Sequence, residues 1–226
     1  MFAYIPARIG SKRIPRKNIR QLCDKPVINH VIDNLSKVTG LKGIAVSTDS
    51  EEIADIVSAY ANVETLSLRA SALADDNSTF MDLVKADLPR FCDHFASSKV
   101  LFVLPTAALI SSDYFQQAVD LLHKHSGLVM SVKAIDNRAL LALQQSENGL
   151  IPLFPENYKL PTKSLPKLFD DAGGFYGFDT LSIGDLEMFI ELSPITPVVL
   201  PDEIAIDVDE EPDWQKLEQN YLANKT

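Results

Sequence analysis

Six positively charged side chains lie close together near the start of the chain, in the stretch IPARIGSKRIPRKNIR at positions 5–20. They are Arg8, Lys12, Arg13, Arg16, Lys17 and Arg20, and no acidic residue precedes Asp24. Backbone N–H groups at Gly10 and Ser11 can join them, and free N–H groups combined with cations bind phosphates. The stretch contains neither of the common nucleotide-binding patterns, G-x-x-x-x-G-K-[ST] and G-x-G-x-x-G. The alternative is a solvated basic loop without a ligand.

The charge of the whole chain makes this basic cluster unusual. The 226 residues include 21 Lys and Arg against 31 Asp and Glu, which gives a formal net charge of -10 and a pI near 4.8. An acidic surface repels a nucleic-acid backbone, so we expect no nucleic-acid partner, whereas a small polyanion could bind at the cluster. We expect no membrane span, because no apolar run reaches the ~18 residues required. Cys23 and Cys92 are too few for a disulfide framework, which favours the cytoplasm.

Two carboxylates near the other end of the chain could bind a metal ion. Asp207 and Asp209 are two residues apart in IDVDEE, and in an extended segment this spacing turns both side chains to one face. Such a pair suits Mg²⁺, which prefers oxygen ligands, and a solvated acidic turn is the alternative. Asp49, which follows a predicted strand, either supports a nucleotide site or caps the next helix.

The elements that would position these residues alternate between buried strands and helices. Strands are predicted at 2–6, 43–48, 63–66, 99–104 and 127–134, with helices at 27–38, from 50, at 81–95 and from 112. This alternation predicts an α/β fold with an open, mostly parallel sheet flanked by helices. The basic cluster would then follow the first strand, at the edge of the sheet where ligands bind.

The pattern becomes irregular after about residue 135. Several prolines interrupt the segment at about 137–170, which we interpret as loops and short edge strands. A strand is predicted at 173–179, a helix at 181–190, short strands at 196–201 and 203–206, and a terminal helix that opens at Pro212 and is anchored by Trp214. No linker or repeat divides the chain, so we predict a single domain over 1–226.

Longer motifs then identify a family. ARIGSKRIPRKN resembles the motif A-R-G-G-S-K-x-I-P-x-K-N of the cytidylyltransferases that activate sialic acid and related nine-carbon sugars, most closely the pseudaminic acid enzymes. VSTDSEEIADIV resembles that family's second-strand segment, and LADDNST, DDAGGFYGF and IDVDEEPDW resemble its L-S-D-D-x-T-G-T, D-A-G-Q-F-Y-W and D-I-D-T-E-E-D-W. The resemblance extends over residues 2–218.

The resemblance implies a fold, an activity and a set of site residues. The fold would be the nucleotide-diphospho-sugar transferase (GT-A-like) fold, and the activity would be transfer of CMP from CTP to an acidic sugar with Mg²⁺ and release of pyrophosphate. Arg8 and Lys17 would act on the triphosphate; the nucleotide would also meet Ala7, Gly10, Ser11, Lys12, Asn18, Asp75 and Asp76. Asp207 and Asp209 would bind the metal, and Lys163, Asp171, Phe175 and Tyr176 the sugar. A homodimer through 137–165 would be expected.

The chain also departs from the motifs of this family. Ile9 replaces a glycine. In VLPTAALI, Leu104 replaces a polar residue, Ala107-Ala108 replace Ser-Pro or Ala-Pro, and Ile110 replaces a basic residue. Pro161 and Ser164 replace an arginine and an acid, which leaves Lys163 as the nearby candidate for the sugar carboxylate, and Gly174 replaces a glutamine. Either the enzyme accepts a different sugar, or the chain is a catalytically impaired nucleotide-binding homologue that acts as a regulator or partner.

Overall fold

A seven-stranded sheet forms the centre of the molecule in the computed structural model, which describes residues 1–75 and 78–224. The strand order is β11-β7-β10-β6-β1-β4-β5. The strands are β1 (Phe2–Pro6), β4 (Ile44–Ser47), β5 (Val63–Glu64), β6 (Lys99–Val103), β7 (Leu128–Ile135), β10 (Leu168–Asp179) and β11 (Ile195–Leu200). Among the described strands of this sheet, only β10 runs antiparallel to its neighbours, so the predicted mostly parallel α/β sheet is confirmed.

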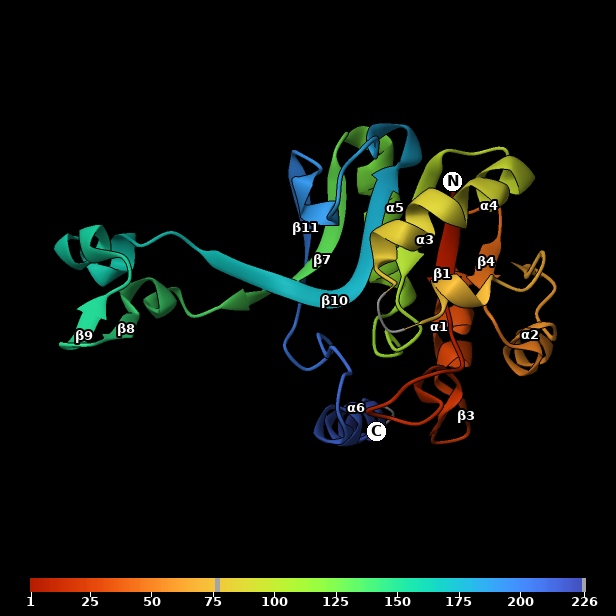
Figure 1. Cartoon of the computed structure of the whole chain (residues 1–226), viewed down its shortest axis with the longest axis horizontal. Helices are drawn as coiled ribbons and strands as arrows, with labels where there is room; N and C mark the ends of the chain where they lie inside the picture. Colours follow the sequence, from red (N-terminus) through yellow and green to blue (C-terminus); the bar gives the residue numbers. More distant parts are fainter. Residues whose placement is uncertain (76–77, 225–226) are drawn as a thin grey trace.

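Helices cover both faces of the sheet (Figure 1). One face carries α1 (Val27–Leu35), α2 (Glu51–Val57), α5 (Ser112–Lys124) and α6 (Glu211–Ala223), and the other carries α3 (Phe80–Ala86) and α4 (Leu88–Phe95). In β1, Ala3 and Ile5 pack against the first set, whereas Phe2 and Tyr4 pack against the second. Burial on both faces explains why these strands are continuously apolar in sequence.

Three predicted elements differ from the structure. The helix at 81–95 is divided into α3 and α4, because Pro89 has no N–H to donate and restricts the residue before it. The helix at 181–190 is replaced by two 3-10 turns, η6 (Thr180–Ser182) and η7 (Phe189–Glu191), with Gly184 at φ +47° between them. The strand at 203–206 is a turn beyond the sheet edge, in which the Ile204 N–H donates to the Pro201 carbonyl.

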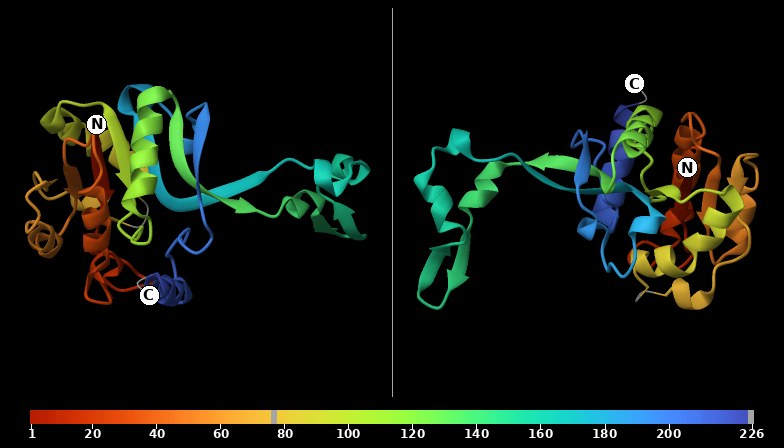
Figure 2. Two further views of the ribbon diagram at one scale, coloured as in Figure 1. Left: turned by 180° about the vertical axis from the view of Figure 1, so that it is seen from behind. Right: turned by 90° about the horizontal axis from the view of Figure 1, so that it is seen from above.

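The irregular segment leaves the sheet between β7 and β10 and projects far to one side (Figures 1 and 2). This segment, residues 136–167, is called the arm below. It contains a separate hairpin of β8 (Leu143–Ser146) and β9 (Gly149–Pro152) and three 3-10 turns, η3 (Asn137–Leu141), η4 (Pro155–Lys159) and η5 (Thr162–Ser164). Many apolar side chains of the arm are exposed, among them Leu143, Leu150, Ile151, Leu153 and Leu160.

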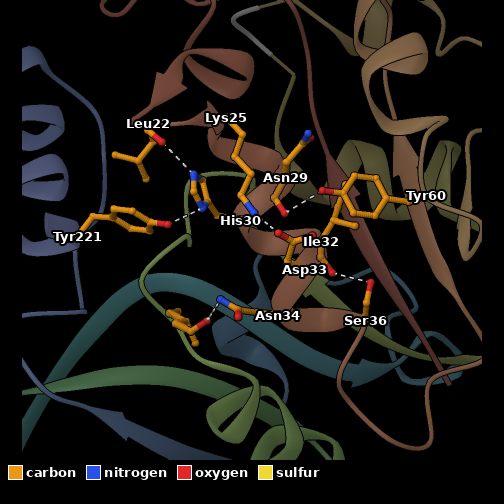
Figure 3. A network of polar contacts seen from close by, with 11 residues as sticks. Leu22, Lys25, Asn29, His30, Ile32, Asp33, Asn34, Ser36, Tyr60 and Tyr221 are labelled. Atoms are coloured by element: carbon orange, nitrogen blue, oxygen red, sulfur yellow. Dashed lines mark hydrogen bonds and ion pairs between the residues drawn. The ribbon is translucent and has the colours of Figure 1, made fainter. Parts of the chain in front are cut away.

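The C-terminal helix α6 is fixed to the beginning of the chain. His30 on α1 bonds through Nε2 to the Leu22 carbonyl oxygen (2.9 Å) and through Nδ1 to the Tyr221 hydroxyl (3.0 Å; Figure 3). Arg20 donates two hydrogen bonds to Glu211 (2.6 and 2.7 Å), and its guanidinium lies 4.6 Å from the centre of the buried Trp214 ring. These contacts hold the segment before α6, with Asp207 and Asp209, against the end of the basic stretch.

Candidate functional site

A cleft of about 930 Å³ opens at the carboxyl ends of β1, β6 and β7. Its walls bring together predicted site residues from distant parts of the sequence: Arg8, Gly10, Ser11, Lys12, Lys17, Asn18, Asp75, Asp171, Tyr176, Asp207 and Asp209. The cleft therefore has a basic wall, from the segment after β1, and an acidic wall, from the segment before α6 and from β10.

Hydrogen bonds hold the basic wall in shape. The Asn18 side chain donates to the Arg8 carbonyl oxygen (2.8 Å), and Asp49 accepts from the Ile9 N–H (3.0 Å), so Asp49 supports this loop. Arg8 in turn donates to the carbonyl oxygens of Ala74 and Asp75 (3.1 and 2.7 Å). Ile9 does not adopt positive φ and packs against the core, so replacing the family's glycine strains nothing here.

The acidic wall meets the basic wall at Asp209. Asp207 and Asp209 both line the cleft, whereas Val208 between them is fully buried, as the alternation of an extended segment requires. Lys17 donates to the Val208 carbonyl oxygen (2.5 Å), and its Nζ lies 3.6 Å from one oxygen of Asp209. Arg13 lies 3.3 Å from the other oxygen. The two walls are thus already linked through opposite charges.

The acidic pair fits a divalent cation. Partial desolvation in the cleft, and then the charge of Asp209, raise the pKa of the Asp207 carboxyl, while Lys17 acts in the opposite direction. A Mg²⁺ ion would relieve this repulsion, and Mg²⁺ is commonly held by one or two carboxylates together with substrate phosphates. Within residues 1–75 and 78–224, no group of three or more His, Cys, Asp or Glu forms a metal cage. The chemistry of the pair suits a metal that arrives with phosphates.

Gly173 lets the acidic wall close tightly. A Cβ added to Gly173 would lie 2.7 Å from Asp207 Cγ, and the residue adopts φ +61°, so only glycine suits this position. Nearby, Tyr176 donates to one oxygen of Asp171 (2.7 Å), and the Gly173 N–H donates to the other (2.8 Å). Burial, and then the charge of Asp171, raise the pKa of the Tyr176 phenol, which keeps it a hydrogen-bond donor. The Asp171–Tyr176 pair is therefore preorganised.

Two cations on the cleft walls were not predicted from the sequence as ligand-binding residues. Arg69 is only 5% exposed, and within the described part of the chain its Nε and Nη1 atoms have no hydrogen-bond partner. Lys133 lies at the carboxyl end of β7. Apart from its place before the LADDNST motif, nothing in the sequence marks Arg69 as a ligand-binding residue. Lys133 does carry a signal, because it lies at the carboxyl end of a predicted parallel strand, where ligands bind in such sheets.

Three predicted site residues within the described part of the chain do not lie on the cleft walls, and a fourth cannot be assigned to a wall. Ala7 is fully buried below the loop. Phe175 points into the core, where its ring packs on Phe115 with centroids 5.6 Å apart, because neighbouring strand residues face opposite ways and Tyr176 faces the cleft. Lys163 lies in η5 of the arm. Asp76 falls outside the described residues.

Four of the departures from the family motifs lie in the core. Ala107, Ala108 and Ile110 are buried in the hydrophobic cluster beside α1 and α5. A Cβ added to Gly174 would lie 2.4 Å from Ile110 Cδ1, so Ile110 fills the space that a side chain at position 174 would need. Ile110 and Gly174 are therefore matched to each other, and of the VLPTAALI departures only Leu104 lines the cleft in the described part of the chain.

Comparison with known proteins decides the family. A sequence model described as cytidylyltransferase matches residues 2–149. The chain belongs to the cytidylyltransferase family. This cytidylyltransferase is 29% identical to the pseudaminic acid cytidylyltransferase of Campylobacter jejuni, with 97% of this chain and 95% of that protein covered. It is 31% identical to the CMP-N,N'-diacetyllegionaminic acid synthase of Legionella pneumophila, with 100% and 97% covered.

The fold of this cytidylyltransferase is similar to that of solved structures. CMP:2-keto-3-deoxy-manno-octonic acid synthetase, solved in complex with CTP, superposes with a TM-score of 0.70 over 100% of this chain and 99% of that one, at 16% identity. The predicted nucleotide-diphospho-sugar transferase fold is therefore confirmed. Among the described residues, no helix combines the length and apolarity needed to cross a membrane.

Proposed function

We propose that this cytidylyltransferase transfers CMP from CTP to a nine-carbon 2-keto sugar acid and releases pyrophosphate. Pseudaminic acid is the first candidate, followed by legionaminic, sialic and 3-deoxy-octulosonic acids. The proposal rests on one observation above all. The chain aligns over nearly the full length of the two cytidylyltransferase relatives described above, and its cleft places a wall of phosphate-binding groups opposite a pair of carboxylates.

The basic wall would bind and activate the triphosphate. Negative charge grows on the pyrophosphate as it leaves, so preorganised donors at that end lower the barrier without a covalent intermediate. Arg8, Lys12 and Lys17, with the N–H groups of Gly10 and Ser11, supply this charge. Arg69 Nε and Nη1, which are buried and have no hydrogen-bond partner among the described residues, would donate to the acceptor edge of the cytosine ring.

Asp207 and Asp209 would hold Mg²⁺. The ion would neutralise phosphate charge and orient the triphosphate when it is bound. The neighbouring cations support this role. Lys17 and Arg13 form ion pairs with Asp209, and when Mg²⁺ takes over the charge of Asp209 these two side chains would be free to bind the phosphates. In this arrangement the sugar hydroxyl attacks the α-phosphorus from the side of Asp171 and Tyr176, opposite the leaving pyrophosphate.

We further propose that the protein acts as a homodimer through the arm. Leu143, Leu150 and Ile151 on the β8–β9 hairpin are 52%, 61% and 49% exposed, which forms an apolar surface that a second copy could cover. Light scattering should give twice the chain mass for the wild type and the chain mass for Leu150→Asp with Ile151→Asp. A wild-type monomer at all accessible concentrations would contradict this proposal.

The decisive experiment is a pyrophosphate-release assay with CTP, Mg²⁺ and each of the four sugar acids. Release with at least one acid is expected, and a folded sample that releases none refutes the enzymatic proposal. The alternative, a nucleotide-binding regulator or partner, predicts CTP binding by calorimetry without turnover. Two of the motif departures that suggested this alternative now have a structural explanation. Ile9 does not adopt positive φ, and Ile110 is a core residue.

A further inference from the structure

One cation of the cleft stands apart from the others. Within the described residues, the cations that line the cleft are Arg8, Lys12, Arg13, Lys17, Arg69 and Lys133. The first five come from the segments that follow β1 and β5, on one side of the sheet centre. Lys133 alone comes from β7, where it lies in register with Asp170 on β10 and Leu200 on β11. It therefore lies on the side opposite the basic wall.

The ammonium group of Lys133 is available to a ligand. Its side chain is half-buried, and among the residues that the structure describes it forms no hydrogen bond or ion pair. The carboxylates beside it have other partners. Asp170 accepts from the Asp171 N–H (3.0 Å), and both oxygens of Asp171 are occupied by Tyr176 and Gly173. An unpaired cation in a cleft is consistent with an anionic ligand group.

The geometry of the reaction brings an anion to this side. With the triphosphate on the basic wall, the attacking and leaving oxygens lie roughly in line, so the sugar occupies the β7–β10 side. In a 2-keto sugar acid, the carbon that bears the attacking hydroxyl also bears the carboxylate. That carboxylate must therefore enter the neighbourhood of Asp170, Asp171 and Asp207, which would repel it.

We propose that Lys133 binds the carboxylate of the sugar acid and is the residue that selects a 2-keto acid over a neutral sugar. This inference rests on the proposed function. It replaces the candidate that the sequence suggested, because Lys163 belongs to the arm and is not on the cleft wall, whereas Lys133 is. A lysine at this position also offsets the acidic wall, so the carboxylate is held beside the hydroxyl that reacts.

The test compares Lys133→Gln with Lys133→Arg in the pyrophosphate-release assay, using the sugar acid that the wild type turns over fastest. Loss of a charge-assisted hydrogen bond raises KM for the acid by roughly tenfold or more. KM for CTP should change by less than about twofold, since the triphosphate contacts the opposite wall. Lys133→Arg, which keeps the charge, should recover most of the affinity. Lys124→Gln, at an exposed lysine at the end of α5, is the matched control.

A second comparison isolates the carboxylate itself. The methyl ester of the same acid should be a poorer substrate than the acid for the wild type by roughly tenfold, and this difference should vanish in Lys133→Gln. Circular dichroism and thermal melting establish that the variants fold. An active wild type whose KM for the acid is unchanged in Lys133→Gln, or is raised instead by Lys163→Gln, overturns this inference alone. A wild type without turnover overturns the proposed function and, with it, this inference.

Discussion

Replacing Arg69 by methionine should change protein stability and CTP affinity in opposite directions. Arg69 is 5% exposed, and two of its nitrogens are buried without a partner among the described residues. Each unsatisfied buried donor costs about 1–3 kcal/mol. Methionine has a similar length, fills irregular spaces and contains no donor. The free energy of unfolding of the ligand-free protein should therefore rise, by about 2 kcal/mol after allowance for imperfect packing.

The same substitution should weaken CTP binding. If Arg69 donates charge-assisted hydrogen bonds to the base, their loss costs about 2 kcal/mol, which corresponds to an increase in Kd of about thirtyfold. Urea denaturation of the free protein and calorimetric titration with CTP measure the two quantities independently.

Arg90→Met provides the contrast. Arg90 donates to Asp87 (3.0 Å), which is 3% exposed, so removing this arginine leaves a buried carboxylate without its cation. That variant should lose about 3 kcal/mol of stability. If Arg69→Met is less stable than the wild type, or if it binds CTP with unchanged affinity, Arg69 is a structural residue and the reasoning fails.

Three further outcomes follow from the same contacts. Lys17→Ala should raise the Kd for CTP by roughly tenfold, with the fold retained in circular dichroism and a small loss of stability from its contacts with Val208 and Asp209; unchanged affinity in a titration would contradict the assignment of the basic wall. Because the pKa of Asp207 is raised in the folded protein, its ionised form opposes folding. Asp207→Asn should thus be more stable than the wild type at neutral pH, and the two denaturation curves should converge as the pH falls below the ordinary range of an aspartate pKa. Gly174→Ala should cost about 1–3 kcal/mol through its clash with Ile110, and in a double-mutant cycle Ile110→Val should recover part of that cost; additive effects would show that the two residues are not coupled.

The sequence predicted the parts of this fold that depend on local patterns. Strands buried on both faces, such as β1 and β6, have continuously apolar sequences and are easy to predict. The basic stretch is recognised both from its cluster of cations and from its similarity to a family motif. The prediction of a helix at 181–190 was wrong because Gly184 adopts positive φ, which interrupts a segment whose composition is otherwise helical.

The site was less predictable where it depends on tertiary contacts. Arg69 and Lys133 are isolated cations in sequence, and only the folded sheet places them on the cleft walls. In the sequence, Ile110 stands where the family has a basic residue, which predicts a lost polar contact. In the fold it is a core residue that packs against Gly174. Phe175 and Tyr176 are adjacent in one motif, and only the position of β10 in the sheet decides which of them faces the cleft.

The contacts between the basic stretch and the α6 region have a consequence for synthesis. Lys17 and Arg20 emerge from the ribosome well before their partners, Val208 and Glu211, which are each 191 residues later in the chain. Contacts of such long sequence separation form late, after the entropy of closing the intervening chain has been overcome. The phosphate-binding wall should therefore lack its final shape in a nascent chain, and ribosome-bound chains arrested before α6 should fold much of the sheet without binding CTP.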